Sequence, residues 1–522
     1  MITEVVAAVY DRRAGFFNTF GAHRAPLQSE KASCHYILQA SVRGKETTLN
    51  QSAGDIKFGT DGWRGIIGDT FIFENVRRVA SAIALYVRNE GQPERGLVVG
   101  YDTRFLSPEA AQEAARQAAA EGIPVFLADR PTPTPAVSYA VVTRNAAGAM
   151  MITASHNPYR WNGIKFKAPY GGSASPAIME RIETYLPGSL PGGGRTPGGA
   201  AAQIETVDLV GPYLDRLKTL VPLERIRLSG RRFVIDPMYG AARGCLARLF
   251  EESGIPYFEI HGEHNPLFPG INPEPIEPHL TGLQQAVVAH KADAGFATDG
   301  DADRVGAVDS RGNCVDSHKI FSILLRHLAV DLKRKGEVVK TFSTTQMIDK
   351  MAAKYGLPLH ITPIGFKYIC ELMLTRDILI GGEESGGIAV GGHLPERDGI
   401  LNSLYLAGII AARGKELGEL IRGLEEEFGP HHYGRIDLEI EMALAHRVVK
   451  QVGEGKLKAL GGSEILSLSD LDGVKMILGD STWVLVRASG TENLLRLYAE
   501  APSRVQVNTL LDAAVDFARR QA

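Results

Sequence analysis

Short apolar runs alternate with stretches of helical pattern from about residue 54 onward. Apolar runs at 97–101 and 124–128 predict strands, and the alanine-rich stretch 108–121 between them predicts a helix. Strands separated by helices of about 10 to 15 residues are typical of βαβ units with a mostly parallel sheet. The rhythm continues to about residue 430, which predicts three similar α/β units. Further strands are expected at 233–236, 256–259, 292–297, 337–341, 357–361 and 378–381, and further helices at 76–90, 239–253, 317–333 and 345–355.

The pattern changes at two places. Residues 186–199 are rich in Pro and Gly, so we expect a surface loop near a domain edge. From about residue 431 the strands come first and a helix last, which predicts a smaller α+β domain. Its strands are expected at 434–440, 473–478, 483–487 and 494–499. The predicted fold is therefore α/β with four domains, at 54–207, 208–311, 312–430 and 431–522.

Residues 1–53 show no sustained periodicity of hydrophobic positions, and we treat them as an N-terminal extension of unknown role. Three interpretations stay open: a poorly ordered tail, a small accessory element, or a chain start placed too far upstream.

Composition supports a multidomain protein with no bulk affinity for nucleic acid or membrane. The 522 residues exceed the size at which one hydrophobic core stops growing. A net charge of -3 offers no general attraction to polyanions, so any affinity for phosphate must be local. The four cysteines form no CxxC pair, which argues against a zinc site or a disulfide scaffold. With no signal peptide pattern and no apolar run of membrane-spanning length, we expect a cytoplasmic protein.

An apolar strand predicted to end at Ser155 delivers a serine hydroxyl into the polar turn 155–158. In parallel sheets, ligands gather at the carboxyl ends of strands. A serine alcohol is a weak nucleophile at neutral pH and needs a base, a metal or a preorganised electrostatic pocket. Taken alone, Ser155 could equally be an ordinary turn residue.

Asp299, Asp301 and Asp303 occupy alternate positions just after a predicted strand. Their carboxylates can converge on one side of an extended loop, and hard oxygen ligands suit Mg²⁺. An EF-hand is excluded, because its sixth position is Arg304 and its twelfth is Ser310. A solvated acidic turn is the alternative.

Two further loops have polar groups suited to a phosphorylated sugar. Arg487, Ser489, Gly490 and Thr491 combine a guanidinium, two hydroxyls and a glycine, which together could cradle an anion. The alternative is an ordinary turn; no Gly-Lys pair is followed by Ser or Thr, so a Walker loop is absent. The other loop, 383–385 (Glu-Glu-Ser), offers acceptors and a hydroxyl to a polyol, or is an acidic turn.

Lys165 lies ten residues beyond Ser155 and could return beside it as a general acid or base. A lone lysine is more often a solvated surface charge, so this role depends on its surroundings.

Taken in order, these loops resemble the four loops of the α-D-phosphohexomutase superfamily, with the match running from about Lys57 to the C-terminus. The loops are 153–158 (phosphoserine), 299–304 (metal), 382–386 (sugar) and 487–492 (phosphate). Supporting stretches lie at 58–65, 100–104, 268–275 and 362–367, the last similar to a substrate loop of phosphoglucomutases.

The resemblance implies an intramolecular phosphotransferase with four domains around a central cleft. Its expected reaction interconverts glucose 1-phosphate and glucose 6-phosphate through phosphorylated Ser155 and glucose 1,6-bisphosphate. Mg²⁺ would be held by Ser155 and the three aspartates, and the partners would be hexose phosphates rather than nucleic acid or membrane. A monomer or a homodimer is expected. The implied roles are proton transfer for Lys165 and His156, phosphoryl stabilisation for Arg64 and Arg304, and substrate binding for Glu383, Ser385, Lys367, Arg487, Ser489, Gly490 and Thr491.

Other functions fit the same residues. Mannose or glucosamine phosphates could replace glucose phosphates, and a synthase could release glucose 1,6-bisphosphate as its product. A phosphatase or a silent sugar-phosphate sensor would need the same binding loops, but a sensor has no use for Ser155 and three aspartates.

Overall fold

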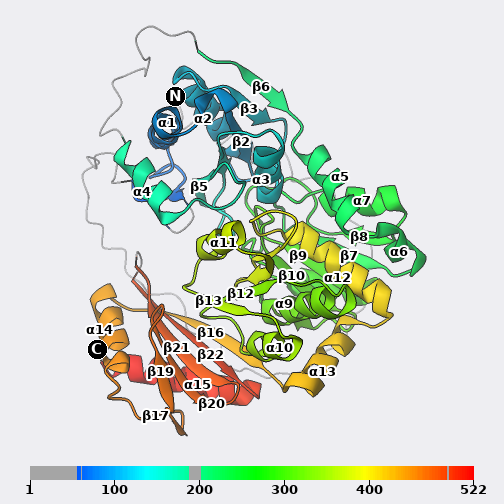
Figure 1. Cartoon of the computed structure of the whole chain (residues 1–522), viewed down its shortest axis with the longest axis vertical. Coiled ribbons are helices and arrows are strands. Elements are labelled where there is room, and N and C mark those ends of the chain that lie inside the picture. The colour runs from blue at the N-terminus through cyan, green and yellow to red at the C-terminus, as the bar shows by residue number, and fades with distance from the viewer. Residues whose placement is uncertain (1–55, 60–61, 187–200, 491–492, 522) are drawn as a thin grey trace, which may run out of the picture. The chain divides into compact units, whose positions relative to one another are not determined.

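Four larger sheets follow one another along the chain in the computed structural model (Figure 1). The structure describes residues 56–59, 62–186, 201–490 and 493–521. The predicted extension at 1–53 lies outside the described residues, and so does nearly all of the predicted loop at 186–199.

The first sheet has the strand order β1-β5-β4-β2-β3-β6. Strands β4, β2, β3 and β6 run parallel, whereas β5 lies antiparallel between β4 and β1. Every residue of β2 and β4 is buried, as expected for parallel strands covered by helices on both faces. The elements are β1 (Trp63–Ile66), α1 (Phe73–Glu90), η1 (Pro93–Arg95), β2 (Leu97–Tyr101), α2 (Ser107–Ala120), β3 (Val125–Ala128), α3 (Thr134–Thr143), β4 (Ala149–Ile152), β5 (Trp161–Lys167), α4 (Pro176–Thr184) and β6 (Ile204–Val207).

The second sheet has the order β11-β10-β9-β7-β8, with β8, β7 and β9 parallel and β10 antiparallel to β9. Two helices precede its strands in the chain and pack against the helix that follows the first strand. The elements are α5 (Val210–Leu220), α6 (Leu223–Leu228), β7 (Phe233–Asp236), α7 (Cys245–Ser253), β8 (Tyr257–Glu259), α8 (Thr281–Ala289), β9 (Ala294–Thr298), β10 (Val305–Asp309) and β11 (Cys314–Val315).

The third sheet has the order β13-β12-β14-β15, again parallel except for one antiparallel edge strand, β15. One buried cluster of side chains, which includes Phe233, Phe296 and Leu404, joins the second and third units. The elements are α9 (Ser317–Arg326), η2 (His327–Asp331), β12 (Glu337–Thr341), α10 (Met347–Tyr355), β13 (Leu359–Thr362), α11 (Phe366–Thr375), β14 (Ile378–Gly382), β15 (Ile388–Val390), α12 (Gly399–Arg413) and α13 (Leu417–Phe428).

The fourth sheet, β16-β22-β21-β20-β19, is antiparallel throughout. Helices α14 and α15 share a buried core with one face of it, and on the other face Trp483, Leu485 and Tyr498 pack with Phe342 of the third unit. The elements are β16 (His432–Glu439), α14 (Met442–Gly453), β17 (Ala459–Leu460), β18 (Ser463–Glu464), β19 (Ser467–Ser469), β20 (Val474–Gly479), β21 (Thr482–Ala488), β22 (Leu494–Ala501) and α15 (Arg504–Arg519).

This succession of sheets confirms the predicted fold class, three α/β units with mixed sheets followed by an α+β unit. The domain boundaries and the central cleft stay predictions.

Three predicted element boundaries are wrong for local reasons. The strand expected to end at Ser155 ends at Ile152, because the chain turns so that Ser155 adopts a left-handed conformation (φ 53°). The helix expected at 239–253 begins only at Cys245, since Met238 and Tyr239 are also left-handed. The helix expected at 317–333 ends at Arg326 and continues as a π-helical turn.

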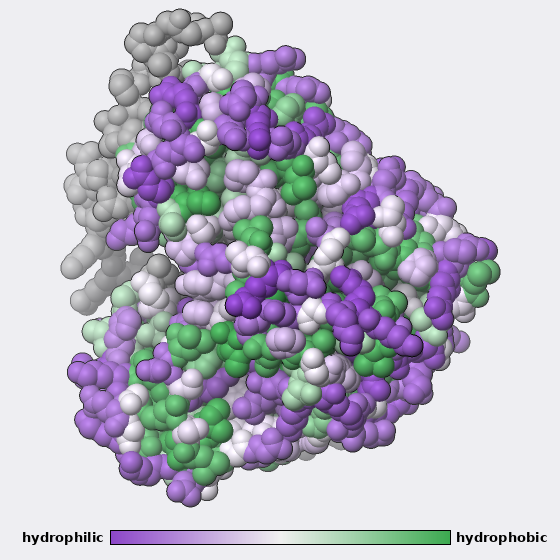
Figure 2. Space-filling model, in the orientation of Figure 1, coloured by the Kyte–Doolittle hydropathy of each residue, from purple (hydrophilic) through white to green (hydrophobic). Residues whose placement is uncertain are grey.

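Polar residues predominate on the visible face of the protein, and the hydrophobic residues there lie in patches between them (Figure 2). Among the described helices, none combines the length and the apolar character needed to cross a bilayer.

Candidate active site

Ser155 lies in the loop between two paired strands, β4 and β5. Its backbone N–H donates to Thr153 Oγ1 (2.8 Å), and its Oγ donates to Asp299 Oδ2 (2.8 Å). A left-handed serine is uncommon and is maintained only where surrounding contacts enforce it. Ser155 is almost fully buried, so its hydroxyl is held at one position against the metal loop.

A buried arginine enforces this loop conformation. Arg104, which follows β2, donates from Nη2 to the carbonyl oxygens of Ser155 (2.5 Å) and Asn157 (2.6 Å). Its Nη1 donates to the carbonyl oxygens of Pro158 (3.0 Å) and Trp161 (3.1 Å). Asp102 lies 3.2 Å from Arg104 Nε and accepts a hydrogen bond from Thr153 Oγ1 (2.6 Å). The Asp102–Arg104 pair therefore fixes both the start and the end of the serine turn.

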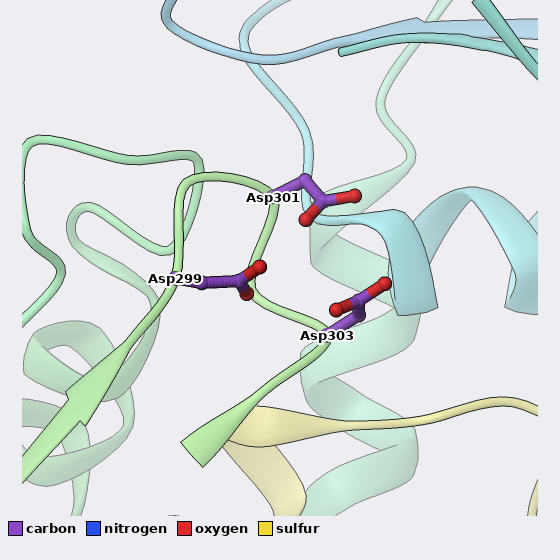
Figure 3. A group of neighbouring side chains, drawn as sticks. All are labelled: Asp299, Asp301 and Asp303. Atoms are coloured by element: carbon purple, nitrogen blue, oxygen red, sulfur yellow. The ribbon is translucent and has the colours of Figure 1, made fainter. Parts of the chain in front are cut away.

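The three aspartates project from the loop that joins β9 to β10 (Figure 3). One oxygen of each carboxylate lies within 4.8 Å of one oxygen of the others, and all three residues are buried. Asp301 Oδ1 and Asp303 Oδ1 are buried and accept no hydrogen bond from the described residues; the guanidinium of Arg304 lies 3.9 Å from Asp303 Oδ1. Buried carboxylate oxygens without partners are unfavourable unless a cation binds them, and oxygen ligands suit Mg²⁺. The three residues therefore fit a magnesium ion.

Two cations from other parts of the chain face the aspartates. Lys165 Nζ on β5 lies 2.7 Å from Asp301 Oδ2 and 3.2 Å from Asp303 Oδ2. Arg397, in the loop before α12, lies 2.5 Å from Asp303 Oδ2. Burial together with Asp303 and Asp301 raises the pKa of Asp299 well above its usual value. Burial acts in the same direction on Asp301, but Lys165 and Thr134 outweigh it and its pKa is lowered.

His156 and two arginines complete the surroundings of Ser155. His156 Nδ1 lies 3.5 Å from Ser155 Oγ. Burial and the nearby charges of Arg304 and Arg64 lower the pKa of His156 well below its ordinary value, which favours the neutral imidazole at pH 7. Arg64 donates to the side chain of Asn157, and the Arg304 backbone N–H donates to Asp299 Oδ1 (3.0 Å).

The sugar loop predicted at 382–386 joins β14 to β15 and lies next to the same cations. Glu383 Oε2 is 3.4 Å from Arg397 Nη1, so one guanidinium connects Glu383 to Asp303. Glu384 points elsewhere: its Oε2 accepts hydrogen bonds from Ser343 Oγ (2.6 Å) and Thr341 Oγ1 (3.2 Å). Ser385 is half-buried.

Arg487 and Lys367 are the residues predicted to bind the second phosphate, one from the fourth unit and one from the third. Arg487 is the last residue but one of β21 and pairs with Asp472. Lys367 lies in the first turn of α11, with its Nζ 5.2 Å from the ring centre of Tyr368. Ser489 is buried and Gly490 is exposed. Thr491, predicted to bind phosphate, lies outside the described residues.

Sequence reasoning missed several residues that shape the site. Arg397 stands in a run of charged residues, which in a sequence usually indicates a solvated loop. Thr134, whose Oγ1 donates to Asp301 Oδ2 (2.7 Å), begins a helix more than 160 residues earlier in the chain. Arg104 lies in a stretch that indicated only the family resemblance. The available signal was the run of three polar residues, 102–104, directly after a buried strand.

Comparison with known proteins matches four successive segments to the domains of phosphoglucomutase/phosphomannomutase: alpha/beta/alpha domains I (55–188), II (211–312) and III (316–428), and the C-terminal domain (444–517). A phosphoglucomutase/phosphomannomutase from Thermococcus kodakarensis is 31% identical over 467 residues, 88% of this chain and 97% of the relative. A phosphoglucosamine mutase from Caldicellulosiruptor saccharolyticus is 34% identical over 450 residues, 85% of this chain and 94% of the relative. A solved structure from Thermus thermophilus, described as a putative phosphomannomutase, is 36% identical with a TM-score of 0.78 and covers 89% of this chain and 99% of its own.

The fit of the aspartates to Mg²⁺ can be tested by binding. Replacing Asp301→Asn removes a negative charge from the triad and is expected to weaken Mg²⁺ binding at least about tenfold. Isothermal titration calorimetry of the full chain measures this directly. Asp215→Asn on α5, whose side chain is 70% exposed, is the matched control and should bind like the unchanged protein. Equal Mg²⁺ affinity in both variants would contradict the assignment.

Proposed function

The chain belongs to the phosphoglucomutase/phosphomannomutase family of intramolecular phosphotransferases, and on this premise we propose that it interconverts glucose 1-phosphate and glucose 6-phosphate through a phosphoserine at Ser155. The observation that carries the proposal is the 2.8 Å hydrogen bond from Ser155 Oγ to Asp299 Oδ2. It holds the hydroxyl that would carry the phosphoryl group beside the carboxylates that would bind the metal.

In the proposed first step, the phosphoryl group leaves Ser155 Oγ for the 6-hydroxyl of glucose 1-phosphate. The bond from Oγ to phosphorus breaks as the bond from O6 forms, and the hydroxyl proton passes to a neutral acceptor, the imidazole of His156 or the deprotonated amine of Lys165. The product, glucose 1,6-bisphosphate, turns end for end. Its 1-phosphoryl group then returns to Ser155: the bond from O1 to phosphorus breaks as the bond to Oγ forms, and O1 takes back the proton held by Lys165 or His156. Glucose 6-phosphate is thereby released.

Charge neutralisation dominates the catalysis of phosphoryl transfer, because the transferring group carries several negative oxygens. Arg64 and Arg304 are proposed to stabilise it from the protein side. Asp299, Asp301, Asp303 and a phosphoserine oxygen would hold Mg²⁺, which when bound neutralises charge on the phosphoryl oxygens. Arg104 holds the turn that aims Ser155 at the substrate.

Substrate binding is proposed at both ends of the sugar phosphate. Glu383 and Ser385 would bind sugar hydroxyls, while Lys367, Arg487, Ser489, Gly490 and Thr491 would hold the phosphate that is not reacting. The preference for glucose rests on the Glu383-Glu384-Ser385 sequence and on the loop 365–367, which resemble those of phosphoglucomutases. Since Glu384 bonds to Ser343 and Thr341, we assign sugar recognition to Glu383 and not to Glu384.

Glucosamine phosphate is the second candidate substrate. It is favoured by the curated relatives named phosphoglucosamine mutase, which are 31 to 34% identical to this chain. The two sugars differ only in the group at C2, where a hydroxyl is replaced by an amine.

Intact mass spectrometry tests the phosphoserine. Protein treated with glucose 1,6-bisphosphate should gain one phosphoryl group that maps to Ser155, and glucose 6-phosphate should remove it. Ser155→Ala should show no gain and should lower kcat on the order of 10³-fold or more, because the nucleophile is lost. Full mutase activity in the alanine variant would overturn the mechanism.

Sugar preference is tested by kcat/KM on glucose 1-phosphate, mannose 1-phosphate and glucosamine 1-phosphate under identical conditions. We expect glucose 1-phosphate to be preferred by about tenfold or more, since polar groups at C2 are discriminated by hydrogen bonding. A higher kcat/KM on glucosamine 1-phosphate would replace our assignment with the second candidate.

The proposed role of Glu383 predicts a pH dependence. Burial raises the pKa of Glu383 to about 7, with Arg397 opposing it and Glu384 adding to it. The carboxylate that accepts hydrogen bonds from sugar hydroxyls is therefore lost as the pH falls through about 7, so kcat/KM should decline on the acid side. In Glu383→Gln, kcat/KM should be lower overall and should lack this decline.

The phosphate groups of the substrate also titrate, at about pH 6, but they do so equally with the unchanged enzyme and with Glu383→Gln. The difference between the two pH profiles therefore isolates Glu383. Identical acid limbs in Glu383→Gln and the unchanged enzyme would contradict the role of this carboxylate.

A further inference from the structure

One carboxylate connects the proposed phosphate loop to the proposed substrate loop of the preceding unit. Asp472 lies in the turn before β20. Its Oδ1 accepts a hydrogen bond from Arg487 Nε (2.8 Å), and its Oδ2 accepts one from the backbone N–H of Ile364 (2.9 Å). Ile364 lies between β13 and α11, three residues before Lys367. The two oxygens of a single side chain are thus shared between Ile364 in one loop and Arg487 beside another, which lie far apart in the sequence.

The local backbone is built to bring Asp472 close to Arg487. Strands β20 and β21 pair antiparallel with Val474 opposite Val486, so the turn at 472–473 lies beside the end of β21. Gly473 adopts φ +80°, and a Cβ there would lie 2.5 Å from the carbonyl oxygen of Val486 and 3.0 Å from Arg487 Cα. Only glycine fits this approach without a shift of the hairpin.

The geometry of the ion pair determines what Arg487 can still bind. Because Asp472 bonds to Nε, the two Nη groups can donate to two oxygens of one phosphate, which is one of the bidentate geometries by which arginine binds anions. Both side chains are about one-fifth exposed, at 21% and 20%, so the pair is partly shielded from solvent and still open to an arriving anion. A guanidinium fixed along one edge loses less conformational entropy when an anion arrives.

We propose that Asp472 is a positioning residue. It orients Arg487 toward the non-reacting phosphate of the substrate and links this phosphate-binding arginine to the loop that bears Lys367. The inference rests on the proposed function, since it takes Arg487 as a phosphate ligand. Asp472 acts through Arg487 and touches no substrate atom itself. The second hydrogen bond of Asp472, from the backbone N–H of Ile364, couples the position of Arg487 to the third unit.

The test measures binding of glucose 6-phosphate by calorimetry in the full chain carrying Ser155→Ala, which cannot turn over. Asp472→Asn keeps one acceptor for Ile364 but loses the charge facing Arg487, and it should weaken binding about five- to tenfold. Asp472→Glu retains the carboxylate and should recover part of the affinity. Asp512→Asn on the exposed face of α15 is the matched control and should change nothing.

A double-mutant cycle shows whether Asp472 acts through Arg487. In an Arg487→Gln background, Asp472→Asn should weaken binding little further, because the group that it positions is already gone. Additive losses would overturn the proposal. So would an unchanged affinity of Asp472→Asn for glucose 6-phosphate.

Kinetics with Ser155 intact separate positioning from a loss of folding. The non-reacting phosphate should be bound equally strongly in the ground state and in the transition state, and such binding contributes to KM and not to kcat. Asp472→Asn should therefore raise KM and leave kcat within about threefold. A lower kcat at unchanged KM would indicate damaged protein and overturn the proposal. If the Ser155→Ala protein binds no hexose phosphate, the proposed function fails, and the role of Asp472 fails with it. If the Ser155→Ala protein binds glucose 6-phosphate and Asp472→Asn does not weaken that binding, only the proposed role of Asp472 is overturned.

Discussion

Three buried carboxylates on one short loop impose the electrostatic condition that the rest of the site satisfies. Burial and mutual repulsion both disfavour the ionised aspartates, so positive charge must be supplied from elsewhere. Lys165 comes from the first sheet and Arg397 from the third unit, and both reach the loop of the second. The need to neutralise Asp301 and Asp303 therefore draws three units of the chain to one point. The cations that meet this need lie where the proposed reaction moves a phosphoryl group.

The phosphoserine, metal, sugar and phosphate loops share one backbone arrangement. Each joins two strands that pair antiparallel: β4 with β5, β9 with β10, β14 with β15, and β21 with β22. In the first three sheets, one of the two strands is parallel to its other neighbours, so the loop leaves at the carboxyl end of a buried parallel strand. In the first sheet, the returning antiparallel strand β5 also carries a site residue, Lys165, which lies opposite Met151 on β4.

The sequence predicts the residue types of the site better than its assembly. Apolar periodicity indicates the βαβ units, and alternate aspartates after a buried strand indicate a cation site. Short returning strands such as β10 and β15 escape prediction, because an apolar run of three to five residues does not reveal its direction. Arg397 escapes for a different reason: its partners Asp303 and Glu383 are brought to it only by tertiary packing. Left-handed residues such as Ser155 and Met238 shorten predicted elements in ways that composition does not show.

The two groups of site residues differ in burial as the proposed reaction requires. Ser155 and the aspartates are held rigidly in the interior, where fixed charges act strongly on a transferring phosphoryl group. Arg487 and its partner Asp472 remain partly exposed. A bisphosphate that turns end for end must be released at its distal phosphate and gripped again at the other one, and a partly hydrated guanidinium permits such exchange more readily than a buried one. A buried site for the reacting phosphate and a more accessible one for the other phosphate follow from the same requirement: only one end of the substrate reacts at a time.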